Sequence, residues 1–220
     1  MPHYLPAWPL LAAFMAASVA LAVTPGPGVI YIVTRSLSQG RAAGFASVGG
    51  IAVGNAVNAM VASLGLAAIL AASTLLYAVL KYLGAAYLFY LAYLMLRQSG
   101  ATLRAPTLGV TRPGKVFRDG VVVAVLNPKT ALFYAALLPQ FVDQPAFFTR
   151  QALMLSFIFV AIAGVSDSLY VLLSRGIAAR FGSSVRGLKM GRYAAAAMYA
   201  GLGVLAATTN HPGSAHKVTR

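Results

Sequence analysis

The sequence predicts an all-α, polytopic membrane protein with six transmembrane helices. Hydrophobic residues make up 60% of the 220 residues and charged residues only 9%, whereas soluble proteins have about 45–50% and about 25%. A soluble chain of this length could not cover its surface with so few charges. Long apolar runs alternate with short polar segments, and most of the basic residues fall in every second polar segment. Such a pattern is typical of loops that are sorted across a membrane.

The first apolar run follows Pro6 and continues to Thr34. It is longer than the apolar part of a signal peptide and is expected to remain as the first span. A short polar turn is expected at residues 35–41. Residues 42–80 then carry no charge, and a single helix of that length would measure about 58 Å, nearly twice the hydrocarbon core. The run must therefore turn back, and residues 71–74 are the expected place.

The later elements follow in the same way. Residues 98–118 form the longest predicted loop, residues 143–145 a short turn, residues 175–192 a basic loop, and the chain from Asn210 a polar tail. The predicted spans cover residues 7–34, 43–70, 75–96, 120–141, 151–174 and 193–208, in a single transmembrane transporter domain over residues 1–220. Two halves of three spans each would have opposite orientations, because three is odd. Each half opens with a proline-broken helix, which permits an inverted repeat.

Basic residues predict the orientation of the chain. Twelve of the seventeen Lys and Arg residues fall in the segments 35–41, 97–118 and 175–192, four fall on the opposite side, and Lys129 lies within a span. Cytoplasmic loops are enriched in Lys and Arg. We therefore expect these three segments in the cytoplasm and both termini outside it, in a multi-pass protein of the cell (inner) membrane.

Two ionisable residues, Lys129 and Asp167, lie deep in the predicted spans. A charge at the centre of a span costs about 2.5–3.5 kcal/mol on the insertion scale. Neither charge is needed to hold the chain in the membrane, so both are candidates for a functional site. The alternative is a structural ion pair in which each residue neutralises the other.

Helix-breaking residues mark two of the spans. The first span contains Thr24-Pro25-Gly26-Pro27-Gly28, and the fourth contains Asn127-Pro128-Lys129. A proline inside a helix lacks an N–H group and clashes with the preceding turn, so the first run is expected to open its helix rather than bend it. In a membrane, an opened helix is tolerated only where protein buries it or where it lines a cavity. The alternative is an ordinary kink, which is the preferred interpretation for a lone proline.

These features share one depth in the predicted bundle. Counting at 1.5 Å per residue from the nearest cytoplasmic charge places both breaks and Asp167 about 10–17 Å into the membrane. Broken helices and paired charges near the midplane are typical of the substrate site of a secondary transporter. We therefore predict a substrate site built from the two breaks, with Lys129 and Asp167, and Asp167 as the residue that couples transport to protons.

The second span adds small and polar residues. Residues spaced by four share a helix face, and here they are Ala46, Gly50, Gly54, Asn58 and Ala62. Such a stripe allows another helix to approach closely; packing within the chain is its main interpretation, and it also permits a homodimer. Asn55 and Asn58 need hydrogen-bond partners, either at the border of the predicted substrate site or across helices.

The inventory of reactive residues excludes several classes of protein. The chain has no cysteine, and its three histidines, His3, His211 and His216, lie in the tails. We therefore expect no catalytic residues, no metal site and no cofactor. The net charge of +14 arises because the chain has only three acidic residues, so it indicates loop orientation rather than nucleic-acid binding. A channel or a non-catalytic structural membrane protein is the alternative to a transporter.

The sequence resembles the LysE/RhtB family of amino-acid exporters over about residues 7–205. The resemblance rests on Thr24-Pro25-Gly26-Pro27, the glycines of the second span, residues 80–88 (LKYLGAAYL), residues 126–129 (LNPK) with 139–141 (PQF), and Asp167. It implies six spans and export of amino acids or related small metabolites, driven by the proton gradient. The expected partners are therefore an amino acid, protons and the lipid bilayer.

The residues agree with that expectation on chemical grounds. A zwitterionic substrate needs positive potential for its carboxylate, which Lys129 and the N–H groups of an opened half-helix would supply. It also needs an anion for its ammonium group, and Asp167 is the only acidic residue within a predicted span. Asp167 would hold a proton in one state and bind the substrate ammonium group, or Lys129, in the other.

Overall fold

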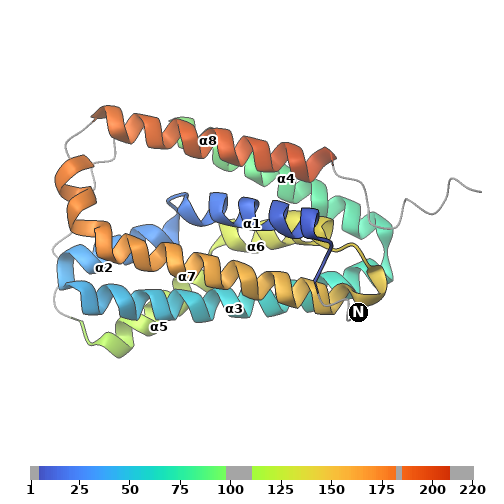
Figure 1. Cartoon of the computed structure of the whole chain (residues 1–220), viewed down its shortest axis with the longest axis horizontal. Coiled ribbons are helices and arrows are strands. Elements are labelled where there is room, and N and C mark those ends of the chain that lie inside the picture. The colour runs from blue at the N-terminus through green and yellow to red at the C-terminus, as the bar shows by residue number, and fades with distance from the viewer. Residues whose placement is uncertain (1–4, 98–110, 182–184, 209–220) are drawn as a thin grey trace, which may run out of the picture.

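The structure is a computed structural model that describes residues 5–97, 111–181 and 185–208, and these parts are helical apart from short connections (Figure 1). The all-α prediction is confirmed. The tail from Asn210 and most of the predicted loop at residues 98–118 lie outside the described residues.

Two helices are broken at the predicted places. Helix α1 (Trp8–Val23) and helix α2 (Pro27–Gln39) are bent by 48° relative to each other. Helix α5 (Pro113–Val125) and helix α6 (Pro128–Leu137), which continues into the 3₁₀ turn η1 (Leu138–Phe141), are bent by 42°. In both cases a proline begins the second helix, a position where its missing N–H costs nothing.

Four helices run without such a break. Helices α3 (Arg41–Ala72) and α4 (Thr74–Arg97) are joined at Ser73, inside the predicted turn at residues 71–74. The Oγ of Ser73 accepts a hydrogen bond from the N–H of Leu76 and so caps the start of α4. After the short 3₁₀ turn η2 (Pro145–Phe147), helix α7 (Phe148–Phe181) and helix α8 (Val185–Thr208) complete the bundle.

Three predicted polar connections are wrong in extent because helices continue into them. Helix α2 runs to Gln39, and Gly40 alone separates it from α3, with a φ of 87° that suits glycine. Helix α5 begins at Pro113, within the predicted loop, and α7 reaches Phe181, within the predicted basic segment. Charged residues such as Arg35 therefore lie on helices rather than in loops.

The helices make this a multi-pass membrane protein. Three helical segments of the described chain are long and apolar enough to cross a membrane, within α3, α4 and α7, and each bent pair adds one more crossing if it counts as a single span. The apolar part of α8, Tyr193–Thr208, is shorter than this test requires. Six crossings in two inverted halves therefore stay a prediction.

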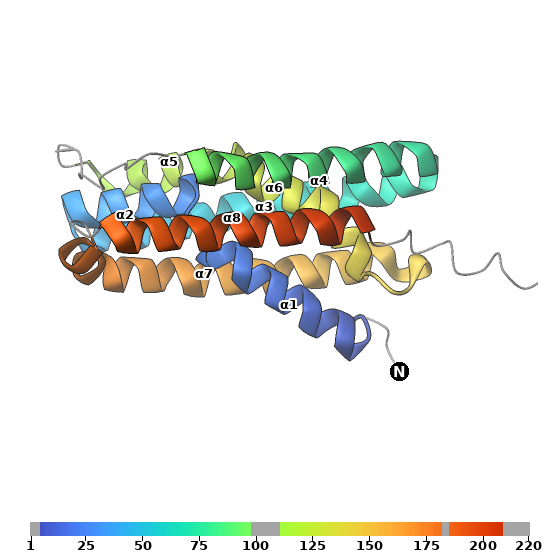
Figure 2. The ribbon, with the colours of Figure 1, turned by 90° about the horizontal axis from the view of Figure 1, so that it is seen from above.

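Two apolar cores lie at different levels of the bundle. The larger core joins α1, α3, α4, α6, η1, α7 and α8, and includes Phe14, Leu88 and Phe133, which are all fully buried. The smaller core joins α2, α3, α5 and α7 through residues such as Ile32 and Val171. Figures 1 and 2 show that α1 and α6 lie in one half of the long axis, and α2 and α5 in the other. The two breaks therefore meet between the cores.

The stripe of small residues on α3 packs against α5. A Cβ atom added to Gly50 would lie 2.1 Å from the carbonyl oxygen of Phe117, and one added to Gly54 would lie 2.6 Å from the Cβ of Ala124. The two backbones therefore approach each other as closely as glycine allows. Packing within the chain, the main interpretation of this stripe, is confirmed. The two glycines of the stripe are occupied by this contact, and the homodimer stays a prediction.

Candidate functional site

A small cavity lies where the two helix breaks meet. Its volume is about 40 Å³, which is room for only a few water-sized molecules. Each of the helices α1, α2, α3, α6 and α7 contributes to its wall, as does each break. The lining residues are Leu21, Ala22, Gly26, Gly28, Val29, Ile51, Asn55, Asn127, Lys129, Thr130, Phe159, Ala163 and Asp167. The structure thus brings together both predicted breaks, both predicted charges and one of the two predicted asparagines.

Lys129 is directed at the end of α1. Its Nζ donates hydrogen bonds of 2.7 Å to the carbonyl oxygen of Leu21 and of 2.6 Å to that of Thr24. The side chain is buried, with 8% of its surface exposed. An ammonium group has three donors, so two are used and one remains for a ligand in the cavity. The lysine therefore links the first break to the second.

Asp167 supplies the negative charge of the cavity. It lies on α7 and is buried, with 7% of its surface exposed. Within the described part of the chain, its carboxylate has no hydrogen-bond partner and forms no ion pair with Lys129 within 4.0 Å. The two charges face one cavity without direct contact. The described residues contain no direct ion pair between Lys129 and Asp167, and the choice between a structural pair and a functional site stays a prediction.

The two helices that begin at the breaks differ in their caps. At the start of α6, the Oδ1 of Asn127 accepts a hydrogen bond from the N–H of Lys129, and its Nδ2 donates one to the Oγ1 of Thr130. No side chain of the described residues caps the start of α2. The N–H groups of Gly28 and Val29 in the first turn of α2 are therefore available to a ligand. Asn127, predicted to bind substrate, acts as a helix cap on the cavity wall.

The two asparagines of α3 have different roles. Asn55 lines the cavity, and its Oδ1 is buried without a hydrogen-bond partner among the described residues. The Nδ2 of Asn58 instead donates a hydrogen bond of 2.9 Å to the carbonyl oxygen of Ala124 on α5. For Asn58 the structure favours the second of the two predicted alternatives, a bond across helices. Asn55 keeps an unsatisfied amide at the cavity.

The other predicted site residues act through the backbone. Thr24 is buried and gives its carbonyl oxygen to Lys129, but its side chain does not line the cavity. The side chains of Pro25, Pro27 and Pro128 are exposed on the bundle surface. The prolines therefore contribute by interrupting the helices, because their nitrogen carries no hydrogen. Gly26 and Gly28 do line the cavity.

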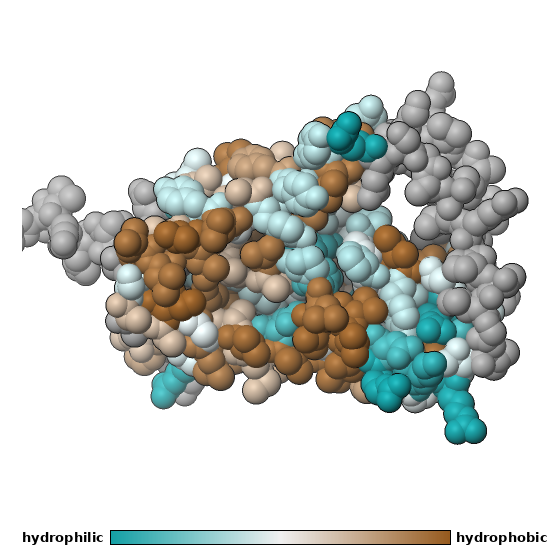
Figure 3. Space-filling model, turned by 180° about the vertical axis from the view of Figure 1, so that it is seen from behind, coloured by the Kyte–Doolittle hydropathy of each residue, from teal (hydrophilic) through white to brown (hydrophobic). Residues whose placement is uncertain are grey.

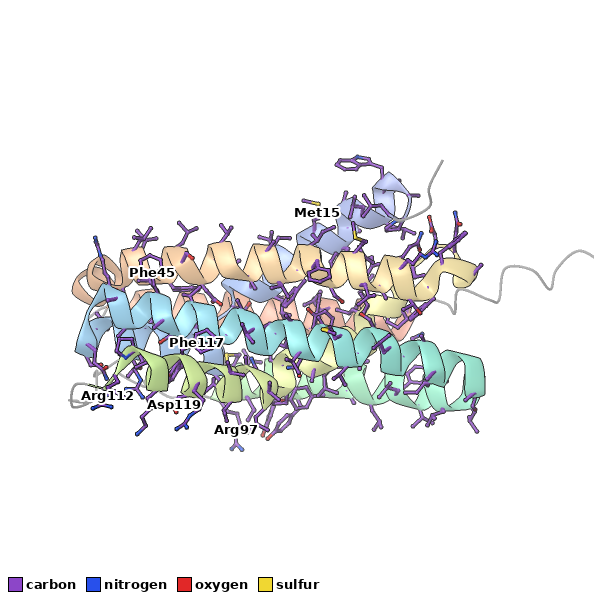
Figure 4. All side chains as sticks on the ribbon, turned by 90° about the horizontal axis from the view of Figure 1, so that it is seen from below. Met15, Phe45, Arg97, Arg112, Phe117 and Asp119 are labelled. Carbon is purple, nitrogen blue, oxygen red and sulfur yellow. The ribbon has the colours of Figure 1, made fainter. Side chains whose placement is uncertain are left out.

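A polar cluster joins α2 to α5 and the residues before it, and we name it the Arg35 cluster (Tyr31, Arg35, Thr111 and Asp119). Arg35 on α2 lies 3.5 Å from the carboxylate of Asp119 on α5, and donates a hydrogen bond of 3.2 Å to Thr111. Its guanidinium also lies 5.3 Å from the centre of the Tyr31 ring. Figure 4 shows Asp119 on α5 toward the same end of the bundle as Arg112. These contacts hold α2 against α5.

An aromatic cluster lies on the other side of the cavity, and it consists of Phe14, Phe133, Tyr134, Phe141 and Phe159. Phe159 lines the cavity, and its ring centre lies 5.1 Å from that of Phe133 and 5.3 Å from that of Tyr134. Phe14 extends the stack toward Phe141, at 5.3 Å. All five side chains are buried. Phe159 thus connects the cavity wall to a buried group of aromatic side chains.

Sequence reasoning missed several of the residues around the cavity. The hydroxyl of Tyr170 donates a hydrogen bond of 2.7 Å to the carbonyl oxygen of Val23, at the same end of α1 that binds Lys129. Its position three residues after Asp167 was an available signal. The apolar wall formed by Val29, Ile51 and Phe159 carried no signal, because such residues occur throughout every span.

No group of three or more His, Cys, Asp or Glu side chains comes together in the described residues. The surface agrees with a membrane protein: on the face in Figure 3, hydrophilic side chains gather toward one end, and apolar side chains cover much of the rest. The cavity itself presents backbone groups, one lysine and one aspartate to whatever enters it.

Comparison with known proteins gives a consistent picture. The profile of the family described as LysE type translocator matches residues 19–210. The homoserine/homoserine lactone efflux protein of Salmonella typhimurium is 33% identical over 170 residues, which cover 76% of this chain and 81% of that protein. The leucine efflux protein of Salmonella choleraesuis is 29% identical over 137 residues, covering 60% and 63%.

An uncharacterized membrane protein of Pseudomonas aeruginosa is 33% identical over 190 residues, which cover 84% of this chain and 88% of that protein. No solved structure matches the chain. Residues 19–210, which the family profile matches, include both helix breaks, Lys129 and Asp167.

Proposed function

The chain belongs to the LysE type translocator family, and we propose that it exports an amino acid or a related small zwitterion across the inner membrane, driven by the proton-motive force. Family membership makes the protein a membrane transporter rather than an enzyme. One observation carries the proposal: a positively polarised helix start and Lys129 face Asp167 across a single cavity at the level of both helix breaks.

The substrate carboxylate binds at the start of α2. The N–H groups of Gly28 and Val29 are uncapped there, and the positive end of the helix dipole favours an anion. Lys129 lines the same cavity, and its third N–H, which makes no bond among the described residues, supplies a charge-assisted hydrogen bond. The start of α6 is already capped by Asn127 and is a weaker candidate.

The substrate ammonium group binds at Asp167. This carboxylate lacks a partner among the described residues, and a buried charge without a counter-charge is costly. The amide of Asn55, also unsatisfied in the described chain, supplies a second contact. Binding of the ammonium therefore satisfies both groups at once.

The rest of the substrate is uncharged. Val29, Ile51, Phe159 and Ala163 form an apolar wall, and Asp167 is the one acidic residue of the described cavity lining. A second cationic group on the substrate would find no carboxylate there. The names of two relatives, homoserine/homoserine lactone and leucine efflux protein, support an amino acid with a neutral side chain.

During transport the cavity opens alternately to the two sides of the membrane. The cavity is too small for an amino acid as it stands, so substrate entry requires the surrounding helices to separate. Loss of the contacts of the Arg35 cluster opens the cytoplasmic side, and rearrangement of the aromatic cluster opens the other. Asp167 exchanges the ammonium group for a proton, which couples export to the proton gradient.

The proposed membrane arrangement has six crossings in two inverted halves, with both termini outside the cytoplasm. Helix α1 packs on α7 as α5 packs on α3, and α2 contacts α7 as α6 contacts α3. A pseudo-two-fold axis in the membrane plane would relate these two pairs of contacts, whereas the extensive contact of α2 with α3 has no counterpart of similar extent between α6 and α7. The end of α2 and the starts of α3 and α5, which are rich in basic residues, lie at one end of the bundle (Figure 1).

Transport assays on the purified protein in liposomes test the proposal. Leucine or homoserine is loaded inside liposomes, and a proton gradient is imposed across them. We expect saturable flux that an uncoupler abolishes, and little flux of lysine. Flux that is linear in substrate and insensitive to the uncoupler would identify a channel instead, and no flux of any amino acid would overturn the proposal.

A further inference from the structure

The carbonyl groups at the end of α1 form a binding site for a cation. The carbonyl oxygens of Leu21 and Thr24 lie within 2.7 Å of the Lys129 ammonium. The break frees them from the usual helix pattern: Pro25 has no N–H to give to Leu21, whose oxygen otherwise accepts only a 3.2 Å bond from the N–H of Thr24. The negative end of the α1 dipole adds to their attraction for a positive charge.

The groups around this point are those that bind monovalent metal ions in other broken helices. Backbone carbonyls of an unwound segment and the C-terminal ends of half-helices commonly coordinate Na⁺ in secondary transporters. The carboxylate of Asp167 lies on the same cavity and has no partner of its own in the described chain. In this protein an ammonium group on a side chain takes the place that a free ion would occupy.

The lysine is fitted to this place by shape as well as by charge. A Cβ added to Gly26 would lie 3.0 Å from the Cδ of Lys129, so the lysine stem passes close over Gly26 and a side chain there would press on it. The ammonium also lies 6.0 Å from the centre of the Tyr199 ring, within the range of a cation–π contact. Glycine at position 26 and the ring on α8 thus both accommodate a cation at the end of α1.

We propose that Lys129 fills a monovalent-cation site at the end of α1, so that the transporter carries its cation as part of its own chain and works without Na⁺. The proposal goes beyond the proposed export function, because it concerns occupancy of the carbonyl site and not the substrate. It implies that removing the ammonium, while keeping the space, leaves a site that Na⁺ can enter.

Thermal unfolding of the purified protein in detergent tests occupancy directly, with Na⁺ as the probe and choline as the control cation at equal ionic strength and pH. We compare the unmodified protein with Lys129→Ala, which leaves space beside the carbonyls, and Lys129→Met, which fills the space without a charge. We expect NaCl to raise the Tm of Lys129→Ala by about 2 °C or more. The Tm of the unmodified protein and of Lys129→Met should be the same in both salts.

Two further variants sharpen the test. Tyr170→Phe removes a neutral donor from the same end of α1 and should show no response to Na⁺. Lys129→Ser, which is small and offers an oxygen ligand, replaces Lys129→Ala if that variant does not fold, and should respond as strongly. The proposal would be overturned if Lys129→Ala and Lys129→Ser each had the same Tm in Na⁺ and in choline. It would also be overturned if Na⁺ raised the Tm of Tyr170→Phe.

Flux measurements form the second arm, and only this arm rests on the proposed function. Export by the unmodified protein should be equal in Na⁺ and choline. Lys129→Ala should lose about tenfold or more of its flux in choline and regain part of it in Na⁺, whereas Lys129→Met should stay inactive in both. Full activity of Lys129→Ala in choline, or a Na⁺ requirement of the unmodified protein, would refute the cation site. Absence of amino-acid flux in the unmodified protein would refute the export function and leave the Tm result intact.

Discussion

The Nζ of Lys129 lies 2.6 Å from the carbonyl oxygen of Thr24, although 105 residues separate them in the sequence. One residue belongs to the break in the second bent pair, and the other to the break in the first. The hydrogen bond therefore fixes the two broken helices relative to each other at the cavity. It also means that the geometry of either break depends on the other.

Replacing Pro25 and Pro27 by alanine tests this dependence. The change restores an N–H at position 25 that can bond the carbonyl of Leu21 in a continuous helix, which takes that carbonyl away from Lys129. We expect export to be lost while expression is retained, with a Tm in detergent close to that of the parent. The gain from removing two prolines, about 3 kcal/mol each in soluble helices, is offset by the loss of hydrogen bonds to a buried ammonium.

The single change Gly26→Ala is the milder companion of that variant, since its Cβ would press on the Lys129 stem. It should reduce flux in part. Near-normal flux in the proline double variant would mean that the first break is only a kink, and the substrate site would have to lie elsewhere.

Asp167→Asn tests the acidic side of the site. Removing a membrane charge should not hinder insertion, so the protein level should be unchanged. Loss of a charge-assisted hydrogen bond, about 1.5–3 kcal/mol, should lower substrate affinity about 10–100-fold. Flux driven by a proton gradient and exchange of labelled for unlabelled substrate are measured separately. Asp143→Asn, which removes an acid outside the cavity, is the matched control.

The two measurements separate the roles of Asp167. If the residue carries only the proton, exchange persists and gradient-driven flux disappears; if it also holds the ammonium, both decline. If Asp167→Asn keeps normal gradient-driven flux but lowers the protein level, the aspartate has a structural role.

The contact between Arg35 and Asp119 should control access from the cytoplasm. Because the chain has no cysteine, a cysteine introduced at Ala163 in the cavity can be labelled without background. We expect Arg35→Gln or Asp119→Asn to raise the labelling rate by an impermeant reagent from the cytoplasmic side about two- to fivefold, in line with a partly exposed ion pair. A variant in which Arg35 and Asp119 are exchanged should restore the labelling rate of the parent. A labelling rate that is unchanged in both single variants would show that the Arg35 cluster does not control access to the cavity.

Close packing of α3 on α5 should make Gly50 sensitive to substitution. A Cβ at Gly50 would collide with the carbonyl of Phe117, whereas one at Gly65 on the same helix would meet nothing within 4 Å. Gly50→Ala should therefore destabilise the protein by about 1–3 kcal/mol, and Gly65→Ala should not. Thermal unfolding in detergent compares the two, and equal Tm values would contradict the packing.

Fusions of a reporter protein test the membrane arrangement. Reporters placed after Gln39 and Gly109 should give a cytoplasmic signal, and those placed after Gln144 and Ser214 an outer signal, because basic residues cluster near the first two sites. A cytoplasmic signal at Ser214 would require the two predicted crossings between Gln144 and Ser214 to be replaced by an odd number. The proposed six-span arrangement would then be wrong.

The helix breaks could be predicted from sequence because their cause is local. Pro25, Pro27 and Pro128 each lack the N–H that a continuous helix needs, whatever surrounds them. Helix ends were harder to predict, since the tight junction at Gly40 depends on one left-handed residue rather than on a polar loop. Arg35 and the start of α5 were placed in loops on the evidence of charge alone, which does not distinguish a helix end from a connection.

The components of the site were predictable, but their contacts were not. Counting depth from the charged ends brought Lys129 and Asp167 to one level, and the structure places both at one cavity. The partner of Lys129 is a pair of backbone carbonyls, and no residue type in the sequence marks a free carbonyl in advance. The bond from Asn58 to Ala124 and the cap formed by Asn127 are of the same kind.

The distance along the chain between Thr24 and Lys129 has a consequence for biosynthesis. A ribosome adds about 5–20 residues per second, so the first bent pair enters the membrane roughly 5–20 s before the lysine that binds its carbonyls has been made. During that interval the end of α1 has no partner from the second half of the chain. Until α6 is inserted, we expect the first span either to remain beside the translocation channel or to adopt a straighter helix. The contacts that hold the first break in its final geometry are therefore completed only after Lys129 has been made.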